Sequence, residues 1–538
     1  MTHEQTKHQE RYRWVLMILT VIVTFLVGVQ LLSSWNQPKA QSQLNLYQSD
    51  LLLQASEWQP VVEDADQGKP LPNPLLENDP VAAALKTYRQ VRASVQADLE
   101  RLEQADPPEQ AAIATQARRQ FKADLDLRLG LLLTQADQTE AALTTWSQVA
   151  EASSTPQAAT ASVLRGLWDA PPQLLPNAQQ LLQSQFTGWF KDQSLERLYT
   201  LAQRQDDLTT LQIERQVVAS NALVRVATIN GLTLAGNGAG VIILLVWIVR
   251  AWRQRRPTVS SDPHPLATFQ SPPDRLSGEA EAADSPSIDE SAAYLAHTDL
   301  AQSVLWPAET IWQVMVLWFI AFFAISLAIP LLIYGLGIQP ETLGARPQAY
   351  IAFINYAVLV IVGLSILIWS LKGFLSAPFK WFRLRWRGNW VVWGMSGYFA
   401  ALPLVIIIAL LNQKILGDQG GGNPLLELII QSHDPVTASL LFVMVAGLAP
   451  FFEEILFRGF FLTSLTRYLP LWGAISLSGV VFAIAHLNLA DILPLTVLGC
   501  VLGFIYSRSR NLLASMLLHS LWNSGSFLSL LILGSSSG

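Results

Sequence analysis

The chain has 538 residues, of which 51% are hydrophobic and only 14% are charged, and its net charge is −6. A soluble globular protein usually carries about 25% charged residues. The deficit is uneven, because residues 14–38 and 310–340 contain no charge at all. This composition excludes an ordinary soluble protein. No basic tract is dense enough to predict nucleic-acid binding, and the single cysteine, Cys500, excludes a cysteine-based metal site.

The N-terminal third begins with a predicted membrane anchor. Residues 1–13 form a short polar tail, and residues 14–35 are long and apolar enough to span a bilayer. A cleaved signal peptide is the competing interpretation. Its apolar core would be shorter, about 7–15 residues, and would end at a small-residue cleavage site. We therefore predict a retained anchor.

Residues 36–228 predict an extramembrane helical domain. Apolar residues recur there at three- and four-residue spacing, as in Leu125, Leu129, Leu132 and Leu133, which is typical of amphipathic helices. The stretch 127–150 resembles one tetratricopeptide-type hairpin, with Leu-Gly early and Trp146 late. Stacked repeats need several units to bury a core. A plain helical bundle therefore stays an equal alternative, and in either case the surface of this domain is a candidate site for a protein partner.

A second span is predicted at 229–249, with Gly231, Gly236, Gly238 and Gly240 giving it small residues for close helix packing. Residues 250–308 are rich in Pro, Ser and Asp and predict a disordered linker. Residues 309–538 then hold seven apolar stretches, at about 311–334, 349–371, 391–412, 436–463, 470–487, 491–507 and 511–533. The predicted fold class is all-α, a polytopic transmembrane bundle of about nine spans.

Loop charges predict the orientation, because Lys and Arg are retained on the cytoplasmic side. Basic clusters lie before the first span, after the second, between the fourth and fifth, after the sixth and after the eighth. Nine spans put all these clusters on one face. We therefore expect a multi-pass protein of a bacterial-type plasma membrane or an internal membrane, with a cytoplasmic N-terminus, an external 36–228 domain and a cytoplasmic linker.

The sixth span carries charged residues that need a reason, since a charge inside a membrane costs about 2.5–3.5 kcal/mol on insertion scales. Glu454 and Arg458 are four residues apart, so they share a helix face and can pair. Glu453 is rotated by about 100° from Glu454 and lacks that partner. An unpaired carboxylate in a poorly solvated site is a candidate general base. The competing interpretation is a buried salt bridge beside a stray acid.

Two later helices carry further polar residues. Phe482 and His486 are four residues apart in the seventh predicted span, 470–487. His519 and Asn523 are four residues apart in the ninth, 511–533. A lone intramembrane histidine is more often a helix–helix hydrogen bond than a ligand. Neutral imidazole can nevertheless shuttle protons or bind metal, and an Asn amide can donate to an oxyanion.

The ordered motifs Glu-Glu-x-x-x-Arg, Phe-x-x-x-His and His-x-x-x-Asn resemble the CPBP family of CAAX proteases and bacteriocin-processing enzymes, also called the Abi family, which includes the Ras-converting CAAX endopeptidase. The resemblance covers about residues 391–533. It implies an intramembrane endopeptidase that acts on membrane-associated proteins or peptides. It also implies that Glu453 activates water with the help of His486, that His519 and Asn523 stabilise the oxyanion, and that Glu454 and Arg458 brace the helix.

Metal dependence stays open. Glu453, His486 and His519 would supply three ligands to a divalent metal such as zinc and leave a fourth position for water, but the His-Glu-x-x-His arrangement of soluble zinc proteases is absent. By simple counting, Glu453 and His486 lie at different depths, so they meet only if helices are short, tilted or broken, for which Pro450 and Pro470 are candidates.

Two other functions compete with proteolysis. The first is a non-catalytic membrane scaffold, in which the polar cluster only holds helices together and the external domain binds partners. The second is a transporter with a proton relay, which would need inverted repeats that the sequence does not display.

Overall fold

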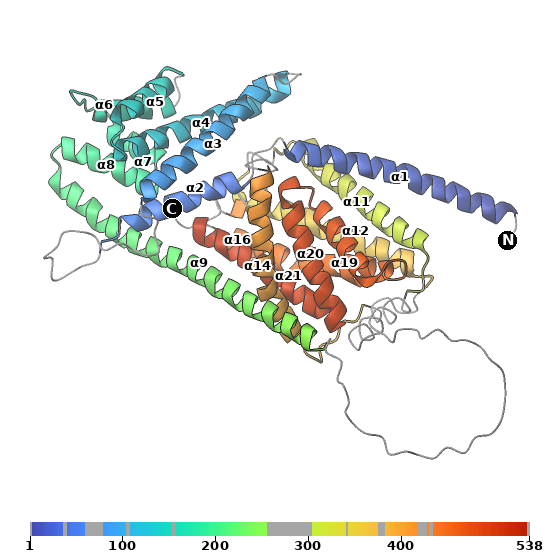
Figure 1. Ribbon diagram of the computed structural model, residues 1–538. Coiled ribbons are helices and arrows are strands. Elements are labelled where there is room, and N and C mark those ends of the chain that lie inside the picture. The colour runs from blue at the N-terminus through green and yellow to red at the C-terminus, as the bar shows by residue number, and fades with distance from the viewer. Residues whose placement is uncertain are drawn as a thin grey trace, which may run out of the picture.

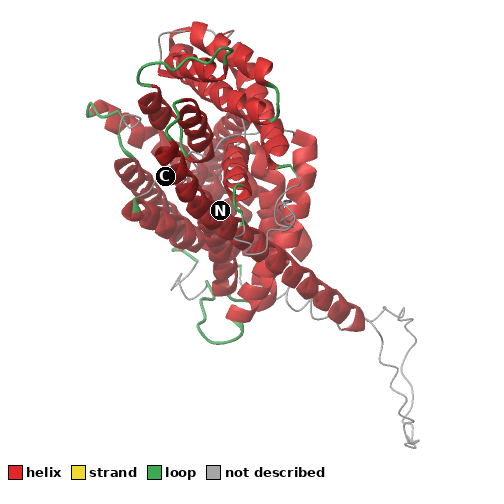
Figure 2. Ribbon diagram, turned by 90° about the vertical axis from the view of Figure 1, so that its left-hand side faces the viewer, coloured by secondary structure: helices red, strands yellow, loops and turns green. Residues whose placement is uncertain are grey.

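The computed structural model describes residues 3–35, 40–59, 79–103, 108–152, 156–254, 304–339, 343–374, 382–416, 428–429 and 434–534. Within these ranges every regular element is a helix (Figure 2). Eight of the described helices are long and apolar enough to cross a membrane. The predicted all-α class is therefore confirmed, and the chain is an integral membrane protein.

The helices predicted to lie outside the membrane, called the extramembrane helices below, gather at one end of the molecule (Figure 1). They are α2 (Ala40–Ser56), α3 (Pro80–Glu103), α4 (Pro108–Gln135), α5 (Thr139–Ala152), α6 (Pro156–Trp168), α7 (Ala178–Gln185) and α8 (Gly188–Leu201). Leucine, valine and aromatic side chains from these helices form one buried core, distinct from the core of the membrane bundle. The domain is thus held by its own apolar packing.

The stretch that resembles a tetratricopeptide hairpin forms the antiparallel pair α4 and α5. Trp146 of α5 is fully buried, and its indole Nε1 donates a hydrogen bond of 3.1 Å to the carbonyl oxygen of Leu127. A Cβ atom at Gly130 would lie only 2.1 Å from Nε1 of Trp146. The Leu-Gly and Trp positions of the pattern therefore have one physical cause, since the glycine makes room for the indole.

The second predicted span is part of a much longer helix. Helix α9 (Gln205–Gln254) has 50 residues, which corresponds to about 75 Å at 1.5 Å per residue. It begins among the extramembrane helices and runs along the membrane bundle without a break at 228 (Figure 1). Residues 250–254 are helical, in contrast to the predicted linker, and 255–303 lie outside the described residues.

Two of the four glycines of the second span contact another helix. A Cβ atom at Gly240 would lie 2.0 Å from the carbonyl oxygen of Phe399, and one at Gly236 would lie 2.9 Å from Leu402. Apart from the surrounding backbone of α9 and the two chain neighbours, no atom of the described residues lies within 4 Å of a Cβ placed at Gly231 or Gly238. The small-residue face therefore packs against α14 (Trp390–Leu416) through positions four apart.

The remaining membrane helices surround a second apolar core. They are α1 (His3–Trp35), α11 (Ala308–Gly335), α12 (Ala345–Leu371), α14, the sixth span at Pro435–Leu465, α19 (Leu471–Ile484), α20 (Ile492–Ser509) and α21 (Leu512–Gly534). Helix α1 packs against α11, and α14 packs against both α20 and α21. Figure 1 shows α1 along the outside of this bundle.

The helix of the seventh predicted span, 470–487, is shorter than predicted. Helix α19 has 14 residues, or about 21 Å, whereas the hydrocarbon core of a bilayer is about 30 Å thick. It ends at Ile484, and Leu487 adopts a positive φ of 54°, which a helix cannot continue through. His486 therefore lies in the turn after the helix and not on it.

The extramembrane domain and the end of α21 lie on the same side of the bundle. Leu533 of α21 packs into a small buried cluster with Leu51 of α2 and Val226 of α9. This contact agrees with an even number of membrane crossings between that domain and the end of α21, because both lie on the same side of the bundle.

Buried carboxylates make the stability of the extramembrane domain pH-dependent. Burial raises the pKa of Asp192 on α8 to about 6, from about 3.9 in an unfolded chain. A raised folded-state pKa contributes stability that is fully present below pH 4 and is lost as the pH rises through 6. Asp192→Asn is therefore expected to stabilise the domain at pH 7.5 by about 1 kcal/mol, after allowance for solvent screening.

Hydrogen–deuterium exchange of α8 amides in the full chain, corrected for intrinsic exchange at each pH, measures this effect. At pH 4.5, closer to the unfolded-state pKa, most of this gain should be absent. Asp169→Asn, at an exposed position, is the control. An equal gain at both pH values would show that the carboxylate charge is not the cause.

Candidate active site

The sixth span changes its helical register on both sides of the two glutamates. It consists of α16 (Pro435–Phe442), the π-helical η2 (Val443–Leu448), α17 (Ala449–Glu454), the π-helical η3 (Ile455–Leu462) and α18 (Thr463–Leu465). Pro450 lies in α17 and has no amide hydrogen to donate. The amide of Ala449 donates five residues back, to Met444, which is the π register. Such π turns are frequent at functional sites.

This register leaves two carbonyl groups without their α-helical donors. In a regular α-helix Val445 would accept from Ala449, and Ala446 would accept from residue 450, which is proline. Helix α21 supplies the missing donors. Ser520 Oγ donates to the Ala446 carbonyl at 2.5 Å, and Asn523 Nδ2 donates to the Val445 carbonyl at 2.8 Å. Asn523 therefore fastens α21 to the π turn.

Glu454 is the centre of a fully buried hydrogen-bond chain. Its Oε1 accepts from Arg458 Nη1 at 2.7 Å and from His519 Nδ1 at 2.9 Å, and both Glu454 and Arg458 have no exposed surface. The Arg458 guanidinium also donates to the Gly499 carbonyl at 3.2 Å. The predicted i,i+4 pair is thus formed, and it holds the imidazole of His519 by one nitrogen.

Glu453 points to the other nitrogen of the same imidazole. Its Oε2 lies 3.8 Å from His519 Nε2, and its Oε1 accepts a 2.9 Å hydrogen bond from the Tyr356 hydroxyl. The 3.8 Å separation is too long for a direct hydrogen bond. One water molecule can contact both atoms. Oε2 of Glu453 is buried and has no hydrogen-bond partner among the described residues.

His486 reaches this cluster through one aromatic ring. The Phe482 ring contacts the imidazole of His486 at 4.9 Å and that of His519 at 5.7 Å between centroids, and the Arg458 guanidinium lies 4.3 Å from its centre. His486 Nδ1 donates to the Phe482 carbonyl at 2.8 Å, since a carbonyl can only accept. Its Nε2 is therefore the free acceptor of the neutral ring, and the residue is exposed.

The segment just after the turn that carries His486 is held by two other helices. Asn412 of α14 donates to the Ala490 carbonyl at 2.7 Å. Ser34, in the last turn of α1, accepts from the amide of Leu489 at 3.2 Å. Helix α1 therefore contacts the segment next to the predicted site.

The predicted zinc ligands do not converge. Within the described ranges, no three His, Cys, Asp or Glu side chains are arranged to hold a metal ion. Glu453 and His519 approach each other, but no hydrogen bond joins His486 to either of them there. His519 also uses Nδ1 for Glu454. These donors do not fit a ready-made zinc site.

The structure brings six of the seven predicted residues into one connected set, namely Glu453, Glu454, Arg458, Phe482, His486 and His519. Asn523 lies one helical turn from His519 and is joined to the π turn instead. Sequence reasoning missed Tyr356, because 97 residues separate it from Glu453 and no spacing links them. An unpaired intramembrane acid was the only signal that such a donor was needed.

Residues 435–525 match the family described as "Type II CAAX prenyl endopeptidase Rce1-like". They form an Rce1-like domain. This Rce1-like segment contains all seven predicted residues, from Glu453 to Asn523, and confirms the resemblance drawn from their spacing. Tyr356, Ser34 and Asn412 lie outside it.

One curated relative agrees with the Rce1-like match. The chain is 26% identical over 134 residues to "Putative membrane peptidase YdiL" of Bacillus subtilis (strain 168). The aligned stretch covers 25% of this chain and 53% of the relative, so the chain spans about half the length of that protein. No solved structure matches the chain.

Proposed function

We propose that this protein is an intramembrane endopeptidase in which Glu453 activates the attacking water. The observation that carries the proposal is the buried Oε2 of Glu453, which has no hydrogen-bond partner in the described part of the chain and lies 3.8 Å from His519 Nε2. A buried polar atom without a partner is unusual and calls for an explanation. A bound water molecule between these two atoms supplies one, and that water is also the nucleophile of hydrolysis.

The chemistry follows from the hydrogen bonds around the site. Glu453 Oε2 takes a proton from the water while the water oxygen attacks the carbonyl carbon of the peptide bond. Negative charge then develops on the carbonyl oxygen, and a protonated His519 donates to it from Nε2, because Nδ1 is held by Glu454. Glu453 passes its proton to the leaving amine as the C–N bond breaks. The Nε2 of His486, on the exposed side of the site, helps Glu453 to activate the water.

The substrate class follows from the position of the cluster within apolar helices. A membrane-associated protein or peptide can bring its peptide bond to Glu453, whereas a soluble protein would have to enter the bilayer. We further propose a cytoplasmic N-terminus, an external extramembrane domain that binds a protein partner, and residence in a bacterial-type plasma membrane or an internal membrane. Prenylation of the substrate and dependence on zinc stay predictions, and chelation of divalent metals tests the second.

Quantitative proteomics of membranes tests the proposal directly. Cells that carry the Glu453→Gln chain should accumulate uncut precursors that cells with the wild-type chain process. Glu309→Gln is the matched control. It removes a carboxylate at the start of α11 that pairs with Arg13 at the surface, where an ion pair is worth about 0–1 kcal/mol.

The scaffold alternative makes the opposite prediction. Deletion of residues 40–225 would abolish function, while Glu453→Gln would leave every precursor processed. Identical precursor patterns for wild type and Glu453→Gln, with the variant inserted at wild-type levels, would therefore overturn the proposed proteolysis.

A further inference from the structure

Glu453 receives its hydrogen bond from a helix that the Rce1-like match does not include. The Tyr356 hydroxyl, in the middle of α12, donates to Glu453 Oε1 at 2.9 Å. We propose that Tyr356 is a positioning residue, which fixes the carboxylate of Glu453 so that Oε2 faces His519. This inference rests on the proposed role of Glu453 as the base.

The hydrogen bond makes the two oxygens of Glu453 unequal. A glutamate carboxylate rotates readily about its last torsion, which has a broad, two-fold profile. Without a donor, either oxygen could face His519 and the group could turn its edge away. With Tyr356 holding Oε1, Oε2 is the oxygen left 3.8 Å from His519 Nε2 and without another partner among the described residues. The phenol therefore selects which oxygen takes the proton.

The register of α12 is fixed next to the same part of the sixth span. A Cβ atom at Gly363 would lie 2.6 Å from the ring of Phe452, the residue before Glu453. Gly363 follows Tyr356 by seven residues, or two helical turns, so both lie on one face of α12. Phe452 is buried against this face. Helix α12 thus holds the backbone beside Glu453 through Gly363 and the carboxylate through Tyr356.

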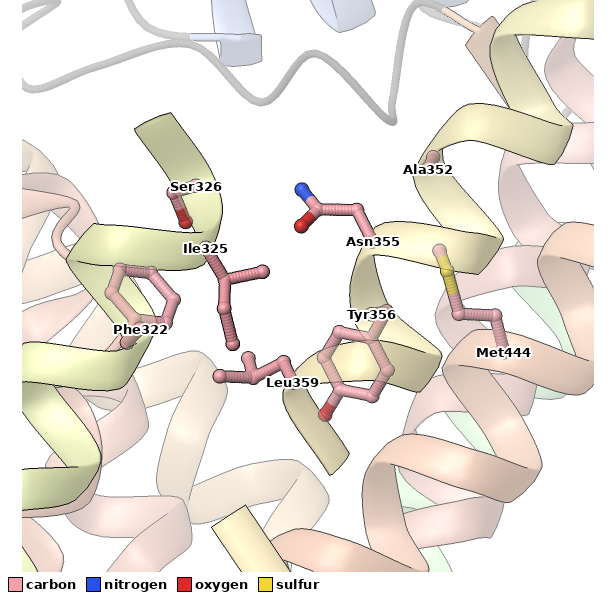
Figure 3. Close-up of a pocket in the computed structure, with 8 residues that line it drawn as sticks. All are labelled: Phe322, Ile325, Ser326, Ala352, Asn355, Tyr356, Leu359 and Met444. Atoms are coloured by element: carbon pink, nitrogen blue, oxygen red, sulfur yellow. The ribbon is translucent and has the colours of Figure 1, made fainter. Parts of the chain in front are cut away.

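Tyr356 also lines an open pocket. This pocket of about 200 Å³ lies between α11 and α12 and is lined mainly by apolar side chains, with Ser326 and Asn355 as polar exceptions. Figure 3 shows the α11 side chains facing those of α12, with the Tyr356 ring beside Leu359. The phenol ring contributes to the pocket wall while its hydroxyl is bonded to the carboxylate. A group that fills this pocket would press on the residue that orients the base.

A buried tyrosine hydroxyl needs an acceptor in any case, so the contact alone could be structural. The two roles differ in what Tyr356→Phe does. If Tyr356 only packs, loss of the hydroxyl changes stability and leaves turnover of folded protein intact. If it positions Glu453, turnover falls while the amount of folded protein stays the same.

The experiment is a double-mutant cycle in the full chain. The reporter is the precursor that accumulates most in Glu453→Gln membranes, and its turnover rate is followed by pulse-chase. Tyr356→Phe should slow turnover about ten-fold, as expected for loss of one hydrogen bond to a charged group. In the Glu453→Asp background the shorter carboxylate no longer reaches the phenol, so the same substitution should cost less than about two-fold.

Tyr398→Phe is the matched control. Tyr398 is a partly buried tyrosine of α14 that does not contact Glu453. Its variant should process the precursor at the wild-type rate. The inference is wrong if Tyr356→Phe is as fast as the wild type, or if it costs the same factor in both Glu453 backgrounds.

Infrared difference spectra separate this inference from the proposed function. The spectrum of wild type minus Glu453→Gln isolates the carboxylate bands of Glu453 without any substrate. These bands should move in the Tyr356→Phe chain and stay in place in the Tyr398→Phe chain. Unmoved bands would overturn the positioning role. Moved bands in a chain that processes no precursor would keep the positioning role and reject proteolysis.

Discussion

Arg458→Leu is expected to destabilise the membrane bundle by about 3–5 kcal/mol, which is the usual cost of leaving a buried charge without its partner. Glu454 has no exposed surface, and its Oε2 already lacks a hydrogen-bond partner among the described residues. Without the guanidinium, the carboxylate would keep only His519. The Gly499 carbonyl and the Phe482 ring would lose the same cation.

The double variant Arg458→Leu/Glu454→Gln tests whether the uncompensated charge of Glu454 causes the destabilisation. The Gln amide oxygen can still accept from His519 Nδ1, while the uncompensated charge is gone. We expect the double variant to recover most of the lost stability, measured as the free energy of unfolding of the full chain in detergent micelles. Equal destabilisation of the single and double variants would assign the effect to lost packing and not to the charge.

The parts of the site that could be predicted are those fixed by local periodicity. Glu454 and Arg458 are four residues apart, and a helix places such residues on one face wherever it lies. The pairing survives the change to a π register just after Glu454. The apolar stretches likewise predicted the membrane helices, because a span needs about 20 apolar residues whatever surrounds it.

The parts that could not be predicted depend on contacts between distant segments. The π register of η2 leaves the carbonyl groups of Val445 and Ala446 dependent on Asn523 and Ser520, which come from α21. No property of residues 443–450 alone says that those donors are present. The end of α19 at Ile484 is equally hidden, since Ala485 and Leu487 continue the apolar stretch while the backbone turns.

The difference between predicted and observed partners of Asn523 changes how its role should be tested. The family resemblance implies that it donates to an oxyanion. In the structure its Nδ2 donates to the Val445 carbonyl, where it replaces a donor lost at the π turn. Both roles need the amide, so loss of activity in an Asn523 variant would not by itself distinguish them. His519 offers the comparison, because it contacts both glutamates.

His519→Gln is expected to lower kcat by about 10²–10³-fold, the usual cost of removing a donor to a developing oxyanion. The Gln amide can still donate to Glu454, so the stability of the bundle and KM should change little. Asn523→Ala is expected to lower the stability of the bundle more than it lowers kcat. It leaves the partly buried Val445 carbonyl without its side-chain donor, at a cost of about 1 kcal/mol in stability, with a smaller loss of kcat in the folded fraction.

Measuring kcat, KM and the free energy of unfolding for both variants separates the two roles. The reporter is again the precursor that accumulates in Glu453→Gln membranes. If Asn523→Ala lowers kcat as far as His519→Gln at unchanged stability, Asn523 donates to the oxyanion and its bond to Val445 is secondary. If His519→Gln unfolds the bundle as Arg458→Leu does, His519 is part of the buried brace and Glu453 must act without it.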